Sequence, residues 1–169
     1  INLTGQAFPS LADAKKAGVS IILLSNHYRP PFDFITDTWR GLHDGVLFIP
    51  GSETNGFLVH PMKSIMAEMA RQDTAEIIKV CTEGQGMIFL SHVEERVNHP
   101  MDGLTGMEIY NRHADAKDDM TIVGPVIGAV TDPARYAAMT ALVAKYPDEM
   151  LATQLDYPEL YLKKWDQET

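Results

Sequence analysis

The sequence has little cysteine, little positive charge and no long hydrophobic run. Cys81 is the single cysteine, which excludes an internal disulfide and a thiolate metal cluster. It lies in an apolar helical stretch, so we expect a small buried side chain. The longest apolar run, residues 19–24, is far too short to span a bilayer. We therefore expect no membrane partner. No signal peptide is visible, but the compartment stays open because the chain does not begin with methionine.

Positive charge is also scarce, because 23 acidic residues face only 14 lysines and arginines, for a net charge of −9. Such a surface repels phosphate backbones, and there is no local basic patch, so nucleic acid is not an expected partner. A small anionic substrate could still bind beside local positive charge. The content of 45% hydrophobic and 22% charged residues is that of an ordinary globular domain. Nothing in the sequence indicates the oligomeric state.

Short apolar runs alternate along the chain with amphipathic segments. The apolar runs predict strands over residues 19–24, 46–49, 86–90, 106–110 and 150–155. The amphipathic segments predict helices over residues 10–16, 63–71, 74–82, 133–145 (capped by Asp132) and 158–165. This alternation predicts an α/β fold in which helices connect parallel strands.

Three segments need separate comment. Residues 19–24 do not alternate between apolar and polar, so we expect this strand to be buried on both faces. Residues 57–59 either extend the strand at 46–49 or return from it. Residues 115–127 are expected to form a surface excursion. No repeat or linker divides the chain, so we predict one domain over residues 1–169.

Polar residues of a similar kind follow successive predicted strands. His27, Glu53, His92 and His113 each come within a few residues of the end of an apolar run. The carboxyl ends of parallel strands meet on one face of an α/β fold, so these side chains should lie close together. Imidazole and carboxylate groups suit Zn, Mn or Fe. A single histidine in a loop is more often structural, so the repetition is what favours a metal site.

At these residues the sequence resembles the PHP (polymerase and histidinol phosphatase) family. Residues 24–27 are similar to the family's strand ending in Thr-Asp-His, and residues 51–53 to its Gly-x-Glu motif. Residues 90–92 resemble its strand that ends in a metal-binding histidine, and residues 106–111 its later Glu-hydrophobe-x-Asn strand. The order and spacing agree over roughly residues 8–111.

The resemblance implies a TIM-like β/α barrel of parallel strands, with a metal site at the C-terminal strand ends. His27, Glu53 and His92 would bind two or three divalent ions (Zn, Mn or Fe), and His113 is a further candidate by its location alone. A metal-activated hydroxide would then hydrolyse a small phosphate ester. The resemblance assigns no catalytic residue.

The sequence departs from the family pattern in several places. Asn26 stands where the family has aspartate, which removes a carboxylate that could support a metal ligand. The family's first His-x-His and last Asp-x-His motifs are absent, and a full barrel takes about 250 residues. We therefore expect an incomplete stretch, at both ends, of a longer PHP-like domain. Two alternatives remain: a metal hydrolase of C–N or C–O bonds, and a degenerate barrel that serves binding or assembly.

Three residues near the expected site are candidates for binding the substrate: Arg29, Arg96 and Asn111. The arginines follow His27 and His92 closely in the sequence, and a guanidinium beside a metal site can bind a phosphate through two hydrogen bonds. A surface salt bridge is the more common outcome for each arginine. His60, at the end of an apolar stretch, could also face the site.

Overall fold

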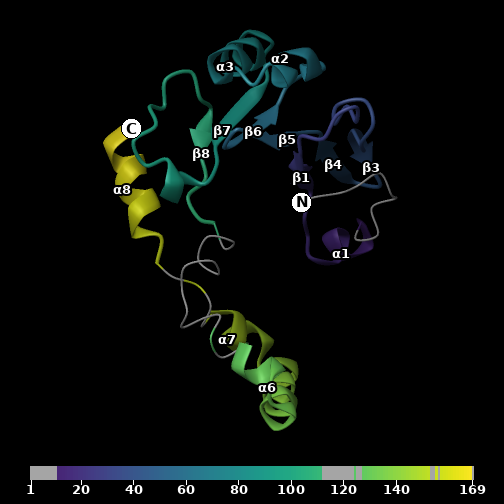
Figure 1. The fold of residues 1–169 in the computed structure, drawn as a ribbon. Coiled ribbons are helices and arrows are strands. Elements are labelled where there is room, and N and C mark those ends of the chain that lie inside the picture. Colours follow the sequence, from purple (N-terminus) through teal and green to yellow (C-terminus); the bar gives the residue numbers. More distant parts are fainter. Residues whose placement is uncertain (1–10, 112–123, 125–126, 153–154, 156, 169) are drawn as a thin grey trace. The chain divides into compact units, whose positions relative to one another are not determined.

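The computed structural model describes residues 11–111, 124, 127–152, 155 and 157–168. The chain divides into two compact units (Figure 1), Ile1–Val93 with Asn98–Glu108, and Glu94–Val97 with Ile109–Thr169. The first unit contains two sheets, and the second consists of helices in its described part. No helix in the described ranges is both long and apolar enough to cross a membrane.

The first sheet has three strands in the order β1 (Ile21–Leu23), β4 (Val46–Ile49) and β3 (Gly41–His43). β1 pairs with β4 in parallel, whereas β3 pairs with β4 antiparallel. Helix α1 (Leu11–Lys16) precedes β1 and packs Leu11 against one face of the sheet. The core of this face is formed by Ile22, Leu24, Val46 and Phe48.

The second sheet has five strands. Their order is β2 (Asn26–His27), β5 (Ser52–Thr54), β6 (Phe57–His60), β7 (Met87–Leu90) and β8 (Gly106–Met107). β2 is parallel to β5 and β8 is parallel to β7, but β6 runs antiparallel to both of its neighbours.

Two helices connect β6 to β7, and a short 3₁₀ helix, Val93–Glu95, follows β7. α2 (Met66–Ala70) and α3 (Thr74–Glu83) lie side by side next to these strands (Figure 1). Asp73 caps α3 by accepting the backbone N–H of Glu76. Cys81 on α3 is fully buried, which confirms the expectation for this residue. Burial raises the pKa of its thiol.

One strand pairing runs without a shift of register through both sheets. Ile21 lies opposite Leu47 in the first sheet, and His27 lies opposite Glu53 in the second with the same offset. Between these pairs, the backbone N–H of Leu24 donates to the carbonyl of Ile49 at 2.9 Å. The segments 21–27 and 47–53 therefore run side by side in one continuous parallel pairing, which places His27 next to Glu53.

Two tight hairpins make β3 antiparallel to β4 and β6 antiparallel to β5. Asp44 and Gly45 join β3 to β4 with φ of 48° and 87°, and Asn55 and Gly56 join β5 to β6 with φ of 50° and 82°. Positive φ at both central residues is the backbone of a type I′ turn, which Asp-Gly and Asn-Gly favour. A two-residue loop can only return a strand antiparallel, because a parallel crossover needs a dozen residues or more.

The predicted TIM-like barrel of parallel strands is therefore wrong. The described part of the chain is mixed α/β with a three-stranded and a five-stranded mixed sheet, and these strands form no closed barrel. The hairpins at Gly45 and Gly56 are the reason, since each reverses the chain where a barrel needs a crossover helix. The predicted burial of residues 19–24 on both faces is also wrong, because Ile21 is 53% and Leu23 is 38% exposed.

The second unit contains α6 (Pro133–Lys145), α7 (Pro147–Ala152) and α8 (Glu159–Glu168). The predicted cap of α6 is confirmed, because the Asp132 side chain accepts the N–H of Ala134 at 2.9 Å. The strand predicted at residues 150–155 is wrong. Pro147 opens a helix there, with acidic residues in its first turn. The excursion predicted at 115–127 falls largely outside the described residues, and a single PHP-like domain over 1–169 stays a prediction.

Gly51 lies where no larger residue fits. A Cβ atom at this position would come within 2.1 Å of His60 Nδ1 and 2.5 Å of the Leu24 carbonyl oxygen. The glycine of the Gly-Ser-Glu segment therefore lets the His60 ring lie directly against the backbone two residues before Glu53.

Replacing Gly51 by alanine should lower the free energy of unfolding by about 1–3 kcal/mol, because the ring or the backbone must move to make room. Urea unfolding followed by circular dichroism measures this change. Gly128→Ala is the control, since the nearest described atom to a Cβ there is Arg135 Nη1 at 3.7 Å, an ordinary contact. The close packing would be refuted by a Gly51→Ala protein as stable as the control.

Candidate metal centre

The structure places Glu53, in the middle of β5, between His27 at the end of β2 and His92, which lies two residues after β7. Glu53 Oε1 lies 3.2 Å from His92 Nε2, and Glu53 Oε2 lies 3.7 Å from His27 Nδ1. The two oxygens of one carboxylate thus face two different imidazoles. These are the three residues that the sequence predicted as metal ligands.

Strand alternation directs His27 and Glu53 to the same face of the sheet. They lie opposite each other on β2 and β5, and their neighbours Asn26 and Ser52 are buried on the other face. Ser52 Oγ donates a hydrogen bond of 2.8 Å to the carbonyl of Asn26. This buried bond between the two strands holds β2 against β5 immediately before the ligand pair.

His92 reaches the same place from β7 through an unusual backbone conformation. Its φ is 51°, in the left-handed region that residues other than glycine rarely adopt. Its backbone N–H donates to Glu108 Oε2 at 2.8 Å, and Glu108 follows β8, the neighbour of β7. The carboxylate of one strand end thereby holds the turn that directs the His92 ring to Glu53. Such strain is concentrated at functional sites.

Glu108 was not predicted as a site residue, although it belongs to the segment 106–111 that resembles a family motif. Its backbone N–H donates to the carbonyl of Leu90 at 2.8 Å, which continues the β7–β8 pairing beyond the strands themselves. The criterion that singled out His92 does not apply to Glu108, because Glu108 lies within the strand predicted at residues 106–110 and not after its end.

The three side chains are accessible to different degrees. The His27 side chain is 63% exposed, whereas those of Glu53 and His92 are each 23% exposed. Contacts between partly exposed polar side chains add little to the stability of the fold. A small molecule could reach the cluster from the side of His27.

Each histidine taken with Glu53 has a separation close to that of two ligands of one divalent ion, but the donor atoms of all three side chains do not lie within 4.8 Å of one another. Two donor atoms that bind one Zn or Mn ion at about 2.1 Å lie about 3.0–3.4 Å apart in octahedral or tetrahedral coordination. The distance between Glu53 and His92 falls in this range, and that between Glu53 and His27 is slightly longer. Two imidazole nitrogens and a carboxylate are also a donor set that these metals favour.

The remaining candidates are placed as follows. Arg29 is exposed in the loop after β2 and, among the described residues, forms no ion pair. Arg96 and Asn111 belong to the second unit, where Arg96 Nη1 donates to Glu95 Oε2 at 3.2 Å. His113 lies outside the described residues. Binding of an anion by these residues stays a prediction.

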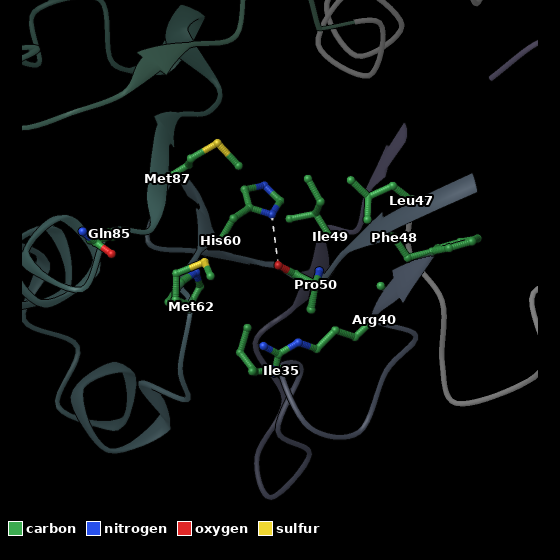
Figure 2. A pocket seen from close by; sticks show the side chains of 12 residues that line it. Ile35, Arg40, Leu47, Phe48, Ile49, Pro50, His60, Met62, Gln85 and Met87 are labelled. Atoms are coloured by element: carbon green, nitrogen blue, oxygen red, sulfur yellow. Dashed lines mark hydrogen bonds between the residues drawn. The ribbon is translucent and has the colours of Figure 1, made fainter. Parts of the chain in front are cut away.

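His60 has a different environment from the histidines of the cluster. It is 4% exposed, and its Nδ1–H donates to the carbonyl of Pro50 at 3.2 Å (Figure 2). Burial lowers the pKa of His60, and the bond to Pro50 opposes this shift in part. The ring is therefore neutral at pH 7, and it supports the backbone that leads through Gly51 to Glu53.

No protein-family model matches the chain, and comparisons with curated proteins and with solved structures also give no match. Membership of the PHP family therefore stays a prediction that rests on the motifs at residues 24–27, 51–53, 90–92 and 106–111. The distances between His27, Glu53 and His92 do not depend on that resemblance.

The lowered pKa of His60 should make the fold sensitive to acid. In the unfolded chain this ring binds a proton at its ordinary pKa of 6.5, but in the folded protein it does so only at lower pH. Stability that is complete above pH 6.5 is therefore lost as the pH falls toward the folded pKa, by at most about 1.4 kcal/mol per pH unit.

Thermal unfolding at pH 7.5 and 5.5 tests this expectation. His60→Gln is the comparison, because its amide can donate to the Pro50 carbonyl but does not titrate. The wild-type Tm should fall more on acidification than that of the variant. Equal falls would assign the acid sensitivity to other groups.

Proposed function

We propose that the protein is a metal-dependent hydrolase that cleaves a small phosphate ester. The observation that supports this most strongly is the Glu53 carboxylate between the His27 and His92 imidazoles. A Zn, Mn or Fe ion bound there supplies a Lewis acid and a water of lowered pKa. The resemblance of the same three residues to PHP motifs favours phosphate esters as substrates.

Glu53 is the central ligand in this proposal. Each of its oxygens has its own imidazole, His92 for Oε1 and His27 for Oε2. Because the three donor atoms do not all lie close together, a carboxylate in this position would take one ion with each histidine. Glu108 acts through the backbone N–H of His92 and is a positioning residue.

The substrate would be bound mainly by local positive charge. The protein has a net charge of −9, so an anion needs a nearby cation to overcome the general repulsion. Arg29 follows His27 by two positions in an exposed loop. Its guanidinium can donate two hydrogen bonds to a phosphate group.

The metal content of the purified protein tests the proposal. Elemental mass spectrometry should find at least one Zn, Mn or Fe per chain in the wild type. Glu53→Gln and His92→Ala should each lower the affinity for the ion by about tenfold or more, since changes to outer partners alone cost that much. His43→Gln is the matched control, because His43 lies on β3 and its ring packs against Trp39.

Hydrolysis of p-nitrophenyl phosphate by the metal-loaded protein gives the second readout. A wild type that retains no ion after dialysis against Zn, Mn and Fe would overturn the metal centre. A metal-loaded protein that cleaves amides or carboxylic esters but no phosphate ester would overturn the substrate class and leave the metal centre intact.

Arg29→Gln should raise KM for a phosphate ester about tenfold, the loss expected for one charge-assisted hydrogen bond, while kcat changes little. Steady-state kinetics on the metal-loaded protein measures both constants. Arg71→Gln is a suitable control, since Arg71 is paired with Glu68 next to α2. Unchanged KM in Arg29→Gln would exclude Arg29 from the substrate site.

A further inference from the structure

A separate pocket of about 330 Å³ lies in the first unit, where the segment 46–54 changes its antiparallel partner. The pairing with β3 ends at Gly41 opposite Phe48, and the pairing with β6 begins at Val59 opposite Ser52. Pro50 lies between these two paired stretches and has no antiparallel strand beside it. The His60 ring lies beside Pro50 instead, as Figure 2 shows. The pocket occupies this gap between the two hairpins.

This pocket is distinct from the metal centre. Met87, at the start of β7, lines the pocket, whereas His92 follows the other end of the same strand. Most of the wall is apolar and includes Ile35, Leu47, Ile49, Met62 and Met87. The volume and the apolar wall are those of sites that bind small organic molecules.

The His60 ring presents a hydrogen-bond acceptor to the pocket. Nδ1 carries the ring proton because it donates to the Pro50 carbonyl, so Nε2 of the neutral ring has only a lone pair. Within the described ranges Nε2 has no hydrogen-bond partner, and no buried polar side-chain atom there lacks one, so Nε2 opens onto free space. Figure 2 shows this nitrogen on the side of the ring away from Pro50.

Arg40 supplies positive charge at the same pocket. Its side chain extends along Pro50 toward Ile35 (Figure 2). In the part of the chain that the structure describes, the guanidinium pairs with no carboxylate. An unpaired cation in a protein with a net charge of −9 favours an anionic ligand.

We propose that this pocket binds a small hydroxylated organic acid with an apolar body. Its carboxylate pairs with Arg40, its chain lies on the apolar wall, and its hydroxyl donates to His60 Nε2. A carboxylate cannot take the place beside Nε2, because two acceptors repel each other, and a hydroxyl alone leaves Arg40 without a counter-ion. A ligand with both groups therefore makes use of both polar partners, the His60 acceptor and the exposed Arg40 cation. The proposal does not rest on the proposed metal centre.

Methionine methyl groups on the wall allow a direct test. Protein labelled with ¹³C at the methionine methyls is titrated with 6-hydroxyhexanoate, hexanoate and hexane-1,6-diol, which share one carbon chain. The methyl signals of Met62 and Met87 should move, while that of Met69, buried on α2, should not. The hydroxy acid should bind about fivefold more tightly than hexanoate or the diol, the effect of one hydrogen bond or more.

Arg40→Gln should reduce binding of the hydroxy acid to the level of the diol and leave the diol unchanged. Arg71→Gln, which lies outside the pocket, should alter neither. At about 10 mM probe, a site with a Kd of about 1 mM is nearly filled. If the methyl signals of Met62 and Met87 do not move at this concentration of the hydroxy acid, the proposed site is wrong. Equal affinity for the three probes would overturn the class of ligand. Neither result bears on metal binding.

Discussion

The parallel pairing of residues 21–27 with residues 47–53 is the interaction on which the first unit depends. Its register is the same in both sheets, and it places His27 directly beside Glu53. A shift by one residue would turn Glu53 to the buried face and Ser52 to the open one, because side chains alternate along a strand. The core and the ligand pair are thus specified by the same register, since buried Phe48 and partly exposed Glu53 both follow from it.

The candidate centre combines this regular pairing with one irregular turn. His27 and Glu53 need only ordinary strand geometry, but His92 reaches them through a left-handed backbone that Glu108 holds from the next strand. Gly51 allows the His60 ring to lie against the backbone that leads to Glu53. Side chains on or just after β2, β6, β7 and β8 therefore support the Glu53 carboxylate, and each contributes through a different contact.

Much of the local structure could be predicted from the sequence. The strand at 46–49 and the helix at 133–145 with its cap Asp132 are confirmed, because apolar periodicity and capping are local signals. His27, Glu53 and His92 were singled out because each follows an apolar run, and the structure brings them together. Their binding of metal stays a prediction.

The parallel barrel was wrong because two local signals were overlooked. Asp44-Gly45 and Asn55-Gly56 are strong hairpin sequences, and recognising them would have predicted antiparallel neighbours for β4 and β5. The pocket at His60 could not be predicted from the sequence, because it depends on where the pairing with β3 ends and the pairing with β6 begins along the segment 46–54. Glu108 could not be predicted either, because it acts by accepting a hydrogen bond from the backbone of His92, and no residue near Glu108 in the sequence indicates that bond.

The two hairpins also have a consequence for the order of folding. Isolated hairpins form in about 1–10 μs, and the one at Gly56 already carries Glu53 on its first strand. His27 and His92 are brought to Glu53 only by closing much longer loops, which costs more chain entropy and takes longer. His27, Glu53 and His92 thus meet late in folding, after β2 has paired with β5 and β7 has paired with β6. An ion held by Glu53 and either histidine would stabilise the finished fold and give no help to its partly folded precursors.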